Sequence, residues 1–177
     1  LVSTGSSETT SLGGAWTTHT IKIDNTNAGT SNVLALGANN LILDVNQGAI
    51  LFHGTTSDFT ISSSGGTIGS NIATNSDVII HTFGTGRLLL NAAIANTTGT
   101  GVFTKGGTGT LVLGASNLYT GATFLNAGTL SISDNNHLGA TAAAAVNIVD
   151  GATLQVTGGA TVSTAHVLTL TGGNATI

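Results

Sequence analysis

The chain has 177 residues, of which 40% are hydrophobic and only 6% are charged, which is the reverse of the composition typical of a disordered segment. Its three basic residues, Lys22, Arg87 and Lys105, stand far apart, so the clustered phosphate contacts of a nucleic-acid-binding protein are excluded. With no cysteine, a disulfide framework, a zinc–thiolate cluster and a catalytic thiol are excluded as well.

Short strand patterns follow one another along the chain, separated by the turn formers Gly, Asn, Asp and Ser. Residues 1–30 are polar and irregular or form a cap, and Trp16 either covers an exposed end or packs under a loop. The Ala-rich run 141–146 is either a tightly stacked segment or a short helical turn. Strands are expected at 20–23, 32–36, 40–45, 49–52, 58–61, 67–68, 77–80, 87–90, 102–103, 110–113, 123–125, 129–132, 146–148, 153–156 and 167–170.

The spacing of these strands indicates a repeating coil. Residues 109–113 and 128–132 share the pattern Gly-Thr-apolar-x-apolar nineteen positions apart. Similar strands return from Leu43 to Ile61, Ile61 to Ile80, Leu113 to Ile132 and Ile132 to Val156. Hairpin signals are almost absent, which favours a parallel β-helix over a sandwich or propeller. We therefore expect one continuous domain, 1–177, of eight or nine coils of roughly twenty residues.

The most distinctive sequence lies in the second half of the chain. Residues 103–113 read FTKGGTGTLVL, residues 114–123 read GASNLYTGAT, and residues 126–130 read NAGTL. On these segments, the stretch from Ala92 to about Val156 resembles the autotransporter-associated β-strand repeat, also called the passenger-associated transport repeat. The resemblance implies a right-handed parallel β-helix in a large bacterial protein that is secreted or displayed at the cell surface.

The positions of this repeat are expected to be structural. Glycine is expected at corners, and Asn117 is expected to support a corner by bonding its own turn. The Tyr119 ring is expected to pack across a coil corner. The structural positions of the motif are Gly109, Leu111, Asn117, Tyr119, Gly121, Gly128 and Leu130.

Acidic side chains are the candidates for chemistry, although solvated turn acids are the simpler interpretation. On a solenoid they could line one edge and bind calcium or a sugar. The paired carboxylates of a glycosidase stand about 5–9.5 Å apart, and either Asp44 with Asp58 or Asp58 with Asp77 could stack in this way. A lyase would need a basic residue as well, for which Arg87 and Lys105 are the nearby choices. We expect no catalytic, cofactor or metal site. The candidate acids are Asp24, Asp44, Asp58 and Asp77, which recur at 20, 14 and 19 residues.

The histidines share no ligand spacing and are expected at the surface or in turns. Two local pairs are conceivable, His53 with Asp58 and His81 with Asp77. The five histidines are His19, His53, His81, His137 and His166.

The expected function is structural: an extracellular or surface-displayed solenoid segment that acts as a stalk, a scaffold or a self-assembling filament building block. Few charged residues protect the open edges, which predicts head-to-tail stacking of copies or of adjoining repeats. An adhesin or glycan-binding passenger module is the alternative, and a polysaccharide lyase or glycosidase is the second alternative. Neither nucleic acid nor membrane insertion is expected, since no run approaches the roughly eighteen apolar residues of a membrane span.

Overall fold

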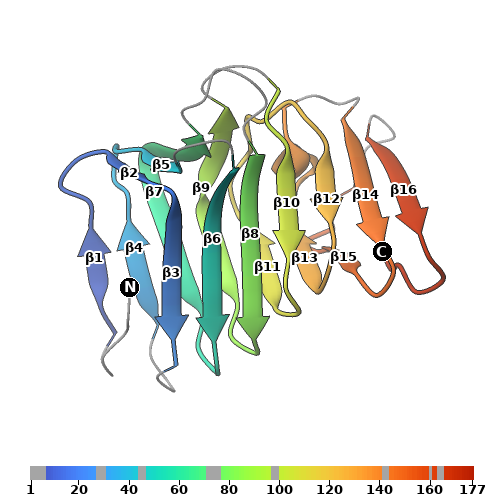
Figure 1. Ribbon diagram of the computed structural model, residues 1–177, viewed down its shortest axis with the longest axis horizontal. Coiled ribbons are helices and arrows are strands. Elements are labelled where there is room, and N and C mark those ends of the chain that lie inside the picture. Colours follow the sequence, from blue (N-terminus) through green and yellow to red (C-terminus); the bar gives the residue numbers. More distant parts are fainter. Residues whose placement is uncertain are drawn as a thin grey trace.

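A computed structural model of the chain describes residues 7–26, 31–43, 47–70, 77–96, 100–140, 144–159, 161–162 and 166–177. The described residues form sixteen strands and one short 3-10 helix, η1 (Asn135–Leu138). The strands make two sheets that face each other. In each sheet the strands follow one another along the long axis of the molecule, and each strand runs across that axis (Figure 1). Every strand pairing in the two sheets is parallel, so the predicted parallel β-solenoid is confirmed.

The chain alternates between the two sheets. The nine-stranded sheet contains β1 (Thr9–Ser11), β2 (Trp16–Thr18), β4 (Asn32–Ala35), β5 (Leu41–Leu43), β7 (Phe59–Ser70), β9 (Leu88–Asn96), β11 (Thr110–Leu113), β13 (Thr129–Ile132) and β15 (Thr153–Val156). The seven-stranded sheet contains β3 (Thr20–Asn25), β6 (Gln47–Gly54), β8 (Asp77–Gly84), β10 (Phe103–Gly106), β12 (Thr123–Leu125), β14 (Ala145–Val149) and β16 (Val167–Thr171).

One passage of the chain through both sheets forms a rung, and the solenoid has fewer rungs than expected. Seven strands stack along the main path of each sheet, and five of these rungs have a neighbour on both sides. The prediction of eight or nine coils was wrong because the first coils are long. Thr20 pairs with Ala49 and Ala49 with Ile79, which makes coils of 29 and 30 residues. From Phe103 onward the coils shorten to between 19 and 24 residues.

Because the coils differ in length, some of the strand pairs predicted from the twenty-residue spacing form and others do not. Leu113 stacks on Ile132 and Ile132 on Val156, as expected. Ile61, however, stacks on Leu90, whereas Ile80 lies in the other sheet. The twenty-residue spacing therefore describes the later rungs correctly and fails in the earlier ones.

The inward side chains form columns that run along the axis. In the nine-stranded sheet one column contains Phe59, Leu88, Leu111, Leu130 and Leu154, all of them buried. These columns join those of the opposite sheet in one continuous hydrophobic core. Burial of such side chains, together with hydrogen bonds between rungs, stabilises each rung on its neighbours.

The N-terminal part of the chain is more regular than expected. Residues 9–25 carry β1, β2 and β3, and Trp16 lies on β2, paired with Leu41. Near the C-terminal half, β14 begins at Ala145, while residues 141–143 lie outside the described residues. No helix in the described part of the chain is long and apolar enough to cross a membrane.

Candidate functional site: the stacked corners of the repeat

The two Gly-Thr-Leu segments of the sequence lie directly on top of each other. Thr110 pairs with Thr129, and Leu111 pairs with Leu130. Both leucines are fully buried, whereas the threonines face outward in a ladder that continues to Thr153. The motif is therefore a rung-to-rung contact, in which identical residues of successive coils meet.

Glycine is required where successive corners approach closely. Gly128 has a φ of 66°, and a Cβ built on it would lie 2.5 Å from the carbonyl oxygens of Gly107 and Gly109. Gly109 in turn donates its N–H to the Thr82 carbonyl at 2.8 Å. A side chain on Gly121 would lie 2.5 Å from the Gly101 carbonyl oxygen. These glycines let the backbones of neighbouring rungs bond directly.

Asn117 connects three rungs through its side chain. Its Oδ1 accepts the Ile94 N–H at 2.7 Å, and its Nδ2 donates to the His137 carbonyl at 2.6 Å. Its backbone N–H donates to the Asn136 carbonyl at 2.9 Å. The expectation that Asn117 bonds its own turn was wrong, since its side-chain bonds reach the rungs on either side. A buried amide with both ends satisfied ties the solenoid together along its axis.

Tyr119 is buried at the corner that precedes β12, as expected. Its ring packs against Phe103 with centroids 5.7 Å apart, and its hydroxyl shares a 2.7 Å hydrogen bond with Thr123. Burial raises the pKa of Tyr119. A Cβ on Gly139 in the next rung would lie 2.9 Å from the Tyr119 ring, so that glycine makes room for the tyrosine.

Lys105 is a structural residue that the sequence analysis missed. It stands in an inward column between Ile80 and Leu125 and is fully buried. Its ammonium donates to the carbonyl oxygens of Gly106, Gly107 and Ala127 at 2.7, 2.9 and 3.0 Å. All three donors are used, and two successive corners are joined. The alternation of strand residues could have indicated its burial, because Phe103 and Lys105 are two positions apart and therefore lie on the same face of the strand.

The burial of Lys105 makes stability depend on pH. Burial lowers the pKa of Lys105 to about 8 from its usual 10.5. Between these two pH values the unfolded chain binds more protons than the folded chain, so the free energy of unfolding rises with pH. We expect the free energy of unfolding to rise by about 1 to 2 kcal/mol over this range. This is less than the full lowering of the pKa implies, because the three carbonyl oxygens favour the charged ammonium in the folded chain.

Denaturant titrations at intervals from pH 7 to pH 10 test this expectation, with Lys105→Met as the control. The variant should show no rise in this range. Above pH 10 the raised pKa of Tyr119 acts in the opposite direction, because the unfolded chain then loses its tyrosine proton first. A rise of equal size in both proteins would show that Lys105 is not its source.

The carboxylates of Asp58 and Asp77, one of the two pairs that a glycosidase could have used, lie far apart. Asp58 binds Arg87, with 2.6 Å between Oδ2 and Nη2, and this partner lowers the pKa of Asp58. Asp77 begins β8, whereas Arg87 follows the end of that strand. Eight residues of extended strand span roughly 25 Å, which is far beyond glycosidase spacing. Asp44, the remaining candidate, lies outside the described residues.

The histidines have other neighbours than those expected. His53 lies 3.4 Å from Asp24 rather than beside Asp58, and the His81 ring stacks with Phe83 rather than pairing with Asp77. His137 lies in the helical turn η1, as the expectation of a surface or turn position allows, but both His137 and His166 are buried and not at the surface. Burial lowers the pKa of His137. Among the described residues, no three histidine or acidic side chains gather as a metal site would require.

One known family matches the part of the chain that contains these corners. Residues 103–132 match the passenger-associated-transport-repeat family, so the resemblance is confirmed over a shorter stretch than the predicted Ala92 to Val156. The match begins with β10 and ends with β13, and it contains Lys105, Asn117 and Tyr119. No curated protein and no solved structure matches the chain.

Proposed function

We propose that the chain is a structural β-solenoid segment of a secreted or surface-displayed protein, where it acts as an extended spacer. The observation that carries this proposal is that the distinctive polar and glycine positions bond between rungs. Gly109, Asn117 and Lys105 each form at least one hydrogen bond to a neighbouring rung. The match to a passenger-associated transport repeat supports the extracellular or surface location.

Among the described residues, a cavity lies beside the first strands at the N-terminal end of the solenoid. A cavity of about 290 Å³ is lined by Trp16, Thr18, Thr20, Ile21, Lys22 and Leu34. Trp16 is 48% exposed, although its paired neighbour Leu41 is fully buried. This end therefore has room for apolar side chains from another rung.

The C-terminal end presents apolar side chains at the ends of the inward columns. Leu170 stacks on buried Ile148 and is itself 52% exposed. Thr176 forms a bridge with Thr153, so Ile177, which is 60% exposed, follows the column of Leu154. Protruding apolar residues at one end and an apolar cavity at the other support end-to-end stacking with adjoining repeats or with a second copy.

Electron microscopy of the purified chain tests stacking between copies. We expect rods that join end to end, with axial layering near 4.8 Å. Leu170→Asp places a charge on the exposed core column and should shorten the assemblies. Thr169→Asp, on the opposite face of the same strand, is the matched control and should not. Monomers at every concentration would contradict stacking of copies, whereas a chain that is not rod-shaped would contradict the spacer role itself.

A further inference from the structure

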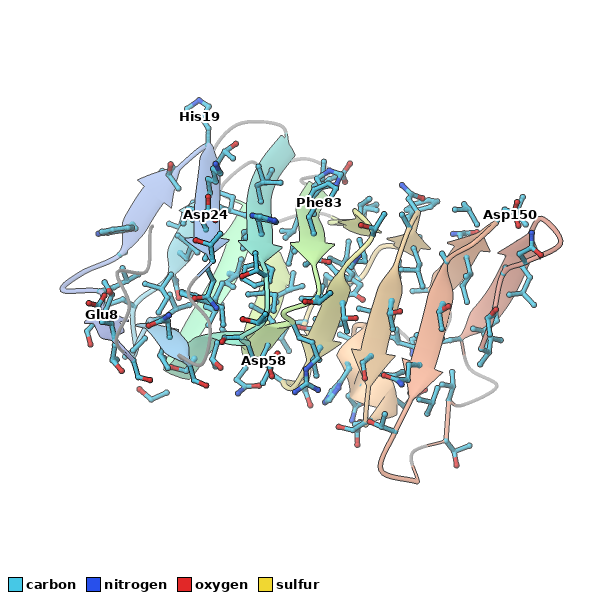
Figure 2. The ribbon with its side chains drawn as sticks, turned by 90° about the horizontal axis from the view of Figure 1, so that it is seen from below. Glu8, His19, Asp24, Asp58, Phe83 and Asp150 are labelled. Carbon is cyan, nitrogen blue, oxygen red and sulfur yellow. The ribbon has the colours of Figure 1, made fainter. Side chains whose placement is uncertain are left out.

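The outer face of the seven-stranded sheet carries a compact group of polar and aromatic side chains over its first three strands. Register places Asp24, His53 and Phe83 side by side on β3, β6 and β8. Lys22 and His81 lie two residues earlier on β3 and β8 and therefore on the same face, where both pair with Leu51 of β6. Figure 2 shows Asp24 and Phe83 along the same side of the molecule. We call Lys22, Asp24, His53, His81 and Phe83 the outer patch.

The polar members of the outer patch hold one another in place. The Lys22 ammonium lies 3.7 Å from Asp24 Oδ2, and His53 Nδ1 lies 3.4 Å from Asp24 Oδ1. The side chains of Lys22 and His53 keep 64% and 44% of their surface exposed. One positive and one negative charge therefore stand together, with hydrogen-bonding groups that still reach solvent.

The aromatic members form a surface beside these groups. The rings of His81 and Phe83 are nearly parallel, with an angle of 13° and centroids 6.4 Å apart, and Phe83 is 38% exposed. A Cβ on Gly106 would lie 2.4 Å from His81 Nδ1, so the imidazole ring extends over the glycine of the next rung. The glycine thus leaves room for a ring that lies along the sheet.

We propose that the outer patch binds a neutral oligosaccharide. The apolar face of a sugar ring packs on Phe83, and the carboxylate of Asp24 and the imidazole of His53 bond its hydroxyl groups. Asp24 and Phe83 are two strand spacings apart, about 10 Å, which suits more than one sugar unit along the axis. The opposed charges of Lys22 and Asp24 leave no excess that would favour an anionic ligand.

Other partners fit this surface less well. A peptide that adds as a strand would pair with β3, the end strand of this sheet, and would not lie over Phe83, because β6 and β8 are paired on both sides. A second copy that stacks end to end meets the cavity at the N-terminal end, which shares only Lys22 with the outer patch and leaves His53, His81 and Phe83 uncovered. The proposal does not depend on the spacer role, since the patch lies on the side of the rod.

Titration of the isotope-labelled chain with neutral tetrasaccharides of glucose, N-acetylglucosamine and galactose, followed by NMR, tests the proposal. We expect amide shifts grouped around residues 22–24, 53 and 81–83 with at least one sugar. Phe83→Ala should weaken binding about tenfold, and Asp24→Asn should weaken it by a similar factor. A tetrasaccharide of galacturonic acid serves as the anionic comparison.

Phe124→Ala is the matched control, because Phe124 faces outward from the same sheet on β12 and is 36% exposed. It should bind as the unsubstituted chain does. The proposal fails if no neutral sugar shifts these amides, if only the anionic sugar binds, or if Phe124→Ala weakens binding as much as Phe83→Ala. Far-ultraviolet circular dichroism of each variant shows that the fold is retained before its affinity is compared.

Discussion

Gly128→Ala is expected to lower the free energy of unfolding by about 3 kcal/mol or more. The added Cβ would lie 2.5 Å from two backbone carbonyl oxygens, those of Gly107 and Gly109. Neither oxygen belongs to a flexible side chain, so relief requires the two corners to move apart. That movement also stretches the hydrogen bond from Thr129 N–H to the Gly109 carbonyl, which is 3.2 Å long.

Gly151→Ala separates the clash from the cost of the backbone conformation. Gly151 has a φ of 76°, close to that of Gly128, but no atom lies within 4 Å of a Cβ built on it. Its substitution should cost only the left-handed conformation, about 1 kcal/mol. Urea titrations of both variants give the difference directly. Equal losses would mean that the corners are not held in close contact.

The strands could be read from the sequence because their alternation is local. Fourteen of the sixteen strands overlap expected segments, and those missed are β1 and β2. Both are three residues long and rich in Thr and Ser, so apolar alternation gives them little signal. The expected strands 58–61 and 67–68 form the single strand β7, whose register shifts between Ser62 and Thr67. A register shift depends on the neighbouring rung and leaves no local pattern.

The number of rungs depends on distant pairing and could not be derived in the same way. The rungs that contain β6, β7, β8 and β9 hold long strands in both sheets, of eight, twelve, eight and nine residues. Their coils are therefore longer than those of the glycine-rich repeat. A spacing measured in the repeat cannot be carried to rungs that lack its corners.

The sequence motif indicated where the candidate site lies, but it did not indicate which hydrogen bonds the residues of the site form. Asn117 and Tyr119 were expected to be structural, yet nothing in their neighbours in sequence indicates that Asn117 reaches Ile94 and His137. Lys105 was counted as a scattered charge because burial of lysine is rare. Its three carbonyl partners, Gly106, Gly107 and Ala127, lie 1, 2 and 22 residues further along the chain. Only the fold brings Ala127 close to Lys105.

Asn117→Ala is expected to destabilise the chain by about 3 kcal/mol, because it leaves two buried groups without their side-chain partner. These groups are the N–H of Ile94 and the carbonyl of His137, which lie in different rungs. The Ile94 amide should therefore exchange its hydrogen faster than other amides of β9. Asn147→Ala, on the outward face of β14, is the control and should change stability by no more than about 0.5 kcal/mol.

The same variant should also uncouple the two halves of the solenoid. In a stack of rungs each rung is stabilised chiefly by its neighbours, so a weakened contact lets one side unfold first. Trp16 is the only tryptophan and lies in the first rung, so its fluorescence reports on the N-terminal side. In Asn117→Ala, circular dichroism should begin to change at lower urea concentration than Trp16 fluorescence. Coincident transitions would show that the rungs are coupled mainly through their strands and apolar columns, and that the asparagine bridge contributes little to cooperativity.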